Sequence, residues 1–156
     1  MFEQALQVVL DDEMRNLCTK PYHNHPRGCP NYGKRPVCPP IAMTFEQVYQ
    51  PGPIYLIWTT FNFGDHCAKM RAKHPSWTEP QVRCCLYWQG TARKYHKKEV
   101  EWFKLSHPSN VVTSCPEATG VNVTQTMAHQ GQFLEWPPEK LTYQVSLAGK
   151  VIEYNV

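Results

Sequence analysis

The chain lacks long apolar runs and carries little charge. No stretch of its 156 residues approaches the roughly eighteen uninterrupted apolar residues of a membrane-spanning helix, so we expect no membrane contact. Charged residues make up 19% of the chain and the net charge is +3, too small for bulk electrostatics to indicate nucleic acid. The first residues lack the basic and then apolar pattern of a secretory leader, so the expected location is the cytoplasm.

Several short catalytic and metal-binding motifs are also missing from the sequence. There is no glycine-rich phosphate loop, no nucleophile elbow and no His-Glu-x-x-His pair, so hydrolase and nucleotide-fold functions have no support. No two cysteines have the Cys-x2-Cys spacing by which structural zinc sites usually aim two thiolates at one ion. Seven cysteines are nevertheless present, and they need another explanation.

The number and placement of the cysteines favour metal ligation. An odd number in a chain without an export signal argues against a disulfide framework, which leaves metal ligands, reactive thiols or inert buried thiols. Three of them, Cys18, Cys29 and Cys38, lie in or beside a segment from Pro21 to Pro53 that holds eight of the fourteen prolines. Neither a helix nor a central strand tolerates so many prolines, so we expect a long irregular loop held by its cysteines.

The patterning on both sides of this loop predicts an α+β fold. We expect a small mixed or antiparallel sheet with packed helices and the long proline-rich cysteine loop, in a single metal-binding domain over residues 1–156. Helices are predicted over residues 2–17, 45–49, 65–73, 77–104 and 121–130, from apolar spacing, capping boxes and breakers. Strands are predicted over residues 54–61 and 111–113, with a closing hairpin over 141–147 and 151–154.

Two Cys-Pro steps point toward an iron–sulfur cluster. Clusters take ligands from widely spaced loop positions, and a Cys-Pro step is found beside them in bacterial ferredoxins. Cys29-Pro30 and Cys38-Pro39 both have this step, while Gly28 and Gly33 allow the backbone to approach closely. We therefore expect a [4Fe–4S] cluster as the cofactor, with zinc as the alternative.

At these residues the chain resembles a known family. Residues 29–40, CPNYGKRPVCPP, closely resemble the signature of a family of uncharacterised, predicted metal-binding proteins, which runs Cys, then Cys-x-Asn-Tyr-Gly, then Cys-Pro-Pro. Thr44 and Glu46 look like the helix start that follows, residues 114–123 are similar to its Ser-Met-Glu-Ala-x-Gly-Ile-Asp-Val segment, and residues 141–143 look like its closing strand. The resemblance implies a metal-binding triad of Cys18, Cys29 and Cys38, without an established activity.

A closed site needs a fourth ligand, for which Cys85 is the first candidate. In the predicted helix over 77–104 it shares the inward stripe with Val82, so it would present a fixed thiolate. Cys84, about 100° away around the helix, and Cys115, at a predicted helix start whose dipole favours thiolate, are the alternatives. Each could instead be a buried small apolar residue, as Cys67 is expected to be. His23 and His25 are expected to hydrogen-bond locally within the loop.

Two functions follow from these expectations. The first is a small cytoplasmic iron–sulfur protein that acts with a redox or enzyme partner protein in electron transfer or in sulfur or small-molecule chemistry. The second is a zinc-stabilised, non-catalytic binding module that contacts a protein or nucleic acid through a basic helical face, formed by Arg93, Lys94, Lys97, Lys98 and Lys104. That face could also be an ordinary solvated helix surface, partly balanced by Glu99 and Glu101.

Overall fold

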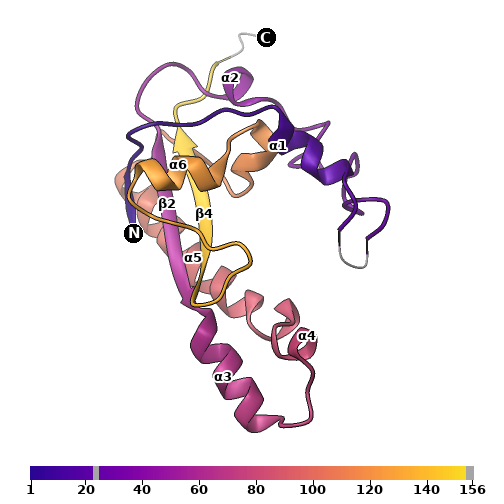
Figure 1. Cartoon of the computed structure of the whole chain (residues 1–156). Coiled ribbons are helices and arrows are strands. Elements are labelled where there is room, and N and C mark those ends of the chain that lie inside the picture. Colours follow the sequence, from indigo (N-terminus) through magenta and orange to yellow (C-terminus); the bar gives the residue numbers. More distant parts are fainter. Residues whose placement is uncertain (23–24, 154–156) are drawn as a thin grey trace.

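The computed structural model, which describes residues 1–22 and 25–153, has an α+β architecture (Figure 1). Four antiparallel strands form one sheet in the order β1-β2-β4-β3. Their bounds are Phe2–Gln4 for β1, Tyr55–Asn62 for β2, Val111–Thr113 for β3 and Leu141–Gly149 for β4. The predicted fold class is therefore confirmed, and the sheet is antiparallel throughout.

The centre of the sheet is the long pair β2 and β4. Its register runs from Tyr55 opposite Ala148 to Asn62 opposite Leu141. The β2 sequence is rich in aromatic and β-branched residues, which favour a pleated surface, and the predicted strand is confirmed with bounds one residue later. The short strands β1 and β3 complete the two edges.

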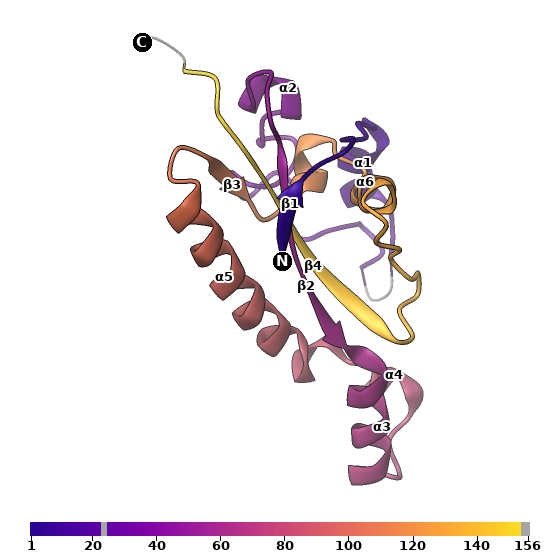
Figure 2. The ribbon, with the colours of Figure 1, turned by 90° about the vertical axis from the view of Figure 1, so that its left-hand side faces the viewer.

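Helices cover both faces of this sheet, as Figure 2 shows. Helix α5, Gln89–Ser106, lies along one face, where its Phe103 packs on Ile57 and Ala148. Helix α6, Val123–His129, lies on the other face. There Met127 packs with Leu56, the strand residue next to Ile57, whose side chain points to the opposite face. Because successive strand side chains point to opposite faces, one apolar run supplies both layers of the core.

The N-terminal segment is not the predicted helix over residues 2–17. Strand β1 is followed by extended chain, and only α1, Glu13–Asn16, and the 3-10 turn η1, Leu17–Thr19, are helical. The backbone finds partners outside the segment instead: Ala5 donates to Ile54 O at 2.8 Å, Asn122 donates to Val9 O at 2.8 Å, and Asp11 donates to Gly120 O at 2.7 Å. These hydrogen bonds to distant parts of the chain satisfy backbone amides and carbonyls that a helix would have paired internally.

The helix predicted over residues 77–104 begins later, at a capping box of Thr78 and Gln81 instead of Ser76 and Glu79, and is also interrupted. Helix α4, Glu79–Val82, ends at Arg83, the 3-10 turn η2, Cys85–Tyr87, follows, and α5 begins only at Gln89. The break brings Trp88 onto the end of the sheet, where its ring stacks on Phe61 at 5.5 Å and meets Phe63 edge-on at 5.3 Å. Aromatic packing at the sheet end therefore overrides the helical spacing read from the sequence.

The predicted C-terminal hairpin is replaced by a continuous strand. Ala148 and Gly149, expected in a turn, pair with Tyr55 and Val111. A Cβ at Gly149 would lie 2.6 Å from Ile54 Cδ1, so this glycine permits close packing rather than a turn. Val151 forms only an isolated bridge to Tyr49, and residue 154 lies outside the described residues.

The remaining helices frame the cysteine loop and the lower end of the sheet. Helix α2, Phe45–Val48, begins at the predicted capping box of Thr44 and Gln47. Helix α3, Phe63–Lys73, continues directly from β2 and projects with α4 beyond the end of the sheet (Figure 1). Among the residues described, no helix combines the length and apolar character needed to cross a bilayer.

Candidate metal centre

Main-chain hydrogen bonds fold the proline-rich loop back on its own cysteines. The Cys29 amide donates to Cys18 O at 2.8 Å, which joins the first two cysteine positions directly. Farther along, the Gly33 amide donates to Pro39 O at 2.8 Å and the Ala42 amide donates to Cys38 O at 2.9 Å. Turns, rather than helix or strand, make up the loop as predicted, and each cysteine lies where two parts of it meet.

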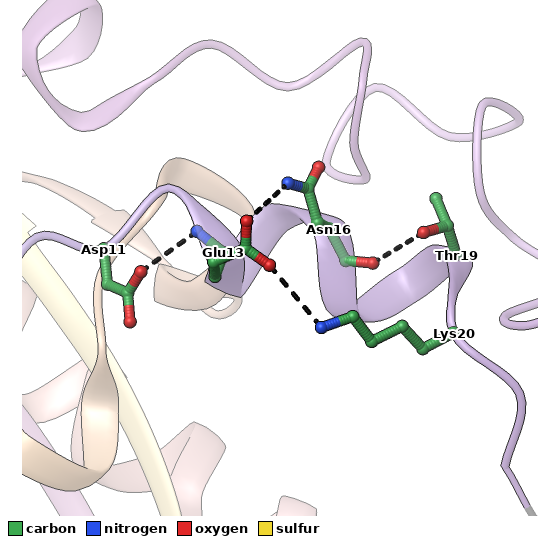
Figure 3. Close-up of polar contacts among 5 residues, drawn as sticks. All are labelled: Asp11, Glu13, Asn16, Thr19 and Lys20. Carbon is green, nitrogen blue, oxygen red and sulfur yellow. Dashed lines mark hydrogen bonds and ion pairs between the residues drawn. The ribbon is translucent and has the colours of Figure 1, made fainter.

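A set of side-chain contacts holds the segment that carries Cys18 (Figure 3). The Glu13 carboxylate accepts from Asn16 Nδ2 at 3.3 Å and from Lys20 Nζ at 3.5 Å, while its own amide donates to Asp11 Oδ1 at 3.0 Å. Thr19 Oγ1 donates to Asn16 O at 2.7 Å. These contacts are exposed, so each contributes little alone, but together they span both ends of the turn that presents Cys18.

Gly28 is required where the loop returns to Cys18. Its φ is +81°, a left-handed conformation that residues with a Cβ rarely adopt. A Cβ at this position would lie 2.5 Å from Cys18 O and 2.9 Å from the Thr19 carbonyl carbon. Only glycine therefore lets the backbone before Cys29 approach the Cys18 carbonyl.

We expect Gly28→Ala to separate Cys18 from Cys29. Gly33→Ala is a matched control because Gly33 also has a positive φ, +69°, while its Cβ would meet only Pro40 Cδ at an ordinary 3.9 Å. The control should cost about 1 kcal/mol for the left-handed residue. Gly28→Ala should cost at least about 1 kcal/mol more, since the Cys29-to-Cys18 hydrogen bond must also break. Denaturant unfolding measures both values, and equal values would contradict this role of Gly28.

A fourth cysteine joins the loop from a distant part of the chain. Cys115 follows β3 and precedes the 3-10 turn η3, Pro116–Thr119, whose neighbour Gly120 accepts the Asp11 amide just before α1. Burial raises the pKa of the Cys18 thiol, and the thiolates of Cys29, Cys38 and Cys115 raise it further in that order. Burial likewise raises the pKa of Cys115, with smaller contributions that include Cys38. Four half-buried thiols from three segments thus share one electrostatic environment.

The sequence carried a signal for Cys115 that the helix prediction obscured. Cys115 precedes Pro116, so it has the same Cys-Pro step as Cys29 and Cys38. Proline after the cysteine fixes φ and removes an amide donor, which suits a thiol-bearing turn. Of the seven cysteines, only these three are followed by proline.

The structure does not bring Cys85 or Cys84 to the other three. Cys85 is exposed in η2, beside α4, because the helix expected to turn it inward is broken. In Figure 1 this part of the chain lies at the α3 and α4 end of the sheet, away from α1. Cys84 is the N-cap residue of η2 and is half-buried. Cys67 is buried against Phe63 and Val82, as expected for a small apolar core residue.

The histidines of the loop are only partly described. His25 pairs with Tyr22 through two backbone hydrogen bonds of 2.8 and 3.2 Å, and the two rings lie 4.6 Å apart. This local pairing matches the expectation for His25. His23 lies outside the described residues.

A half-buried cationic side chain, Arg15, lies beside the cysteine segments. Arg15, three residues before Cys18, donates from Nη2 to Pro40 O at 3.3 Å, two residues after Cys38. Its Cδ would lie 3.9 Å from a Cβ at Gly120. Its buried Nη1 has no hydrogen-bond partner in the described part of the chain. A buried unpaired donor of this kind suits an environment that gains negative charge.

The thiols are neighbours rather than a formed ligand set. Across residues 1–22 and 25–153, no three His, Cys, Asp or Glu side chains are grouped closely enough to hold a metal ion as they stand. The donor chemistry still fits a thiolate-bound centre, because the four sulfurs come from a loop and two turns rather than from a strand or a long helix. Comparison of the chain with protein-family models, curated proteins and solved structures finds no match.

Proposed function

We propose that the chain is a small metalloprotein whose centre is held by Cys18, Cys29, Cys38 and Cys115. The observation that carries the proposal is the convergence of these four thiols from three segments, while Cys67, Cys84 and Cys85 lie elsewhere. Cys115 thereby takes the fourth position for which the sequence favoured Cys85. A [4Fe–4S] cluster is the first candidate for the cofactor and zinc the second.

Electrostatics supports a cation at this point of the fold. Burial first, and the neighbouring thiolates after it, raise the pKa of Cys18, and burial raises the pKa of Cys115, so both thiols are harder to ionise here. A bound metal reverses this, because it stabilises thiolates and binding releases their protons. The same ligation would offset the ordering entropy of the proline-rich loop, about 1–2 kcal/mol per residue for the backbone.

The choice of iron over zinc rests on the ligand pattern. No Cys-x2-Cys pair is present, and three of the four proposed ligands precede proline. Arg15 supplies a half-buried cationic side chain, with a buried Nη1, beside a cluster that would carry net negative charge. Such a cluster supplies one-electron chemistry when bound. With all four positions filled by protein, electron transfer to a redox partner protein in the cytoplasm is the function we favour over catalysis at an open iron.

Zinc remains the second candidate because a basic face accompanies the thiols. Arg93 contributes to the electrostatic environment of Cys115, so helix α5 borders the cysteine set. A zinc ion there would fix the loop against this helix and make a non-catalytic binding module. In that case the partner would be an anionic molecule rather than a redox protein.

Anaerobic purification separates these candidates. We expect a brown protein with a broad visible absorption, containing iron and acid-labile sulfide in equal amounts. A colourless protein with one zinc per chain would select the second candidate. A protein that retains neither metal after anaerobic purification, and takes up neither on reconstitution, would contradict the proposed function.

A further inference from the structure

A positively charged cavity lies between helix α5, strand β4 and the cysteine loop. Its volume is about 550 Å³. Helix α5 forms one wall, and the lining continues through Val112 of β3 and through Gln144 and Ser146 of β4. Four cationic side chains line it and none of its lining residues is acidic; the cations are Arg35, Arg93, Lys97 and Lys104.

The four cations come from two independent parts of the chain. Arg93, Lys97 and Lys104 share one face of α5, since their spacings of four and seven residues are helical. Arg35 reaches the same cavity from the loop, three residues before Cys38. Within the described part of the chain, the one ion pair among the four is a long contact of 3.9 Å between Lys97 Nζ and Glu101. The positive charge of the cavity is therefore left largely uncompensated.

Neutral hydrogen-bonding groups form the inner wall. His96 is buried, with Nε2 2.7 Å from Ser146 Oγ and Nδ1 3.3 Å from Thr59 Oγ1. Burial, and after it the charge of the Met1 ammonium group, lower the pKa of His96, so its ring is neutral at pH 7. The inner wall therefore adds hydrogen-bonded but uncharged groups beneath the cationic side chains.

We propose that this cavity binds a small molecule through a phosphoryl group. Its volume lies in the range of about 300–1,000 Å³ found for small-molecule sites. Two guanidinium groups present forks that match phosphate oxygens, and several positive charges suit a dianion better than a single carboxylate. Cys115 also lines the cavity, so the phosphoryl site would adjoin the proposed metal centre; the four cations are nevertheless supplied by the protein itself, and the inference does not require a bound metal.

Calorimetric titration of the full chain tests the proposal with three probes: inorganic phosphate, glycerol 3-phosphate and adenosine monophosphate. Arg93→Gln and Arg35→Gln each remove a cation from the cavity. Lys94→Gln and Lys98→Gln are matched controls, because they remove the same charge from exposed positions of α5 outside the cavity lining. Thermal unfolding of each variant establishes that the fold is retained.

We expect saturable one-to-one binding, weakened about tenfold or more by either cavity variant, since a hydrogen bond to a charged group is lost. The controls should change affinity less than about twofold, because Lys94 and Lys98 lie outside the cavity lining and act on a bound anion only through screened, longer-range charge. Tighter binding of the organic phosphates would indicate a small organic ligand, and equal binding would indicate free phosphate. Equal losses in all four variants, tighter binding of a single-stranded RNA that depends on Lys94 and Lys98, or no saturation at millimolar probe would each overturn the proposal.

Discussion

Serine at Cys29 or Cys38 is expected to reduce the metal bound per chain to background. Both residues lie at main-chain junctions of the loop, so the substitution removes a ligand without removing the hydrogen bonds that their backbone groups make. Serine is a poor ligand for iron or zinc where thiolate is preferred. Metal analysis after anaerobic purification, with circular dichroism to confirm folding, measures the effect.

The fourth position is tested by a matched pair of substitutions. Cys115→Ser should lose metal as the loop variants do, whereas Cys85→Ser should retain it, because Cys85 is exposed in η2. Loss in Cys85→Ser with retention in Cys115→Ser would restore the ligand set favoured by the sequence alone. Full retention in both Cys29→Ser and Cys38→Ser would contradict a centre at these residues altogether.

Removal of the metal is expected to open the cysteine loop while the sheet persists. The loop has few backbone ladders, so ligation would supply most of what holds it. A ligand present at 100 times its dissociation constant stabilises by about 2.7 kcal/mol, so metal removal should accelerate cleavage of the transiently open loop about 100-fold. The rate of limited trypsin digestion after Arg27 and Lys34, which are exposed in the loop, measures this opening.

The Cys29→Ser variant supplies the control for this digestion. Its loop should already be open, so chelator treatment should not accelerate its cleavage further. Strand β2, paired along its whole length with β4, should stay protected in every sample. Equal resistance at Arg27 and Lys34 before and after metal removal would show that the loop is held by its own hydrogen bonds.

The fold class could be predicted because local and tertiary signals agree in the central elements. The apolar run of β2 and the capping box before α2 both describe what the structure contains. The predicted helix over residues 2–17 is wrong because the apolar residues there pack against distant parts of the same chain. The Val9 carbonyl accepts from the Asn122 amide and the Asp11 amide donates to Gly120 O, just before α6. No local pattern distinguishes those two uses of the same spacing.

The candidate centre could be predicted in part for the same reason. Cys18, Cys29 and Cys38 share one loop, so proline content and spacing sufficed to group them. Cys115 joins them only because α1 packs near η3, a contact between segments about 100 residues apart that sequence spacing does not report. Cys85 was favoured through a helix that ends before it, since Trp88 anchors on Phe61 instead.

X-ray absorption spectroscopy at the edge of the bound metal, on protein purified anaerobically, tests the central claim most directly. The proposed centre predicts a first shell made of sulfur alone, from the thiolates of Cys18, Cys29, Cys38 and Cys115 together with sulfide if the metal is iron. For zinc, four sulfurs at about 2.3 Å are expected. A first shell dominated by nitrogen or oxygen, or an unchanged sulfur shell in Cys115→Ser, would contradict the account.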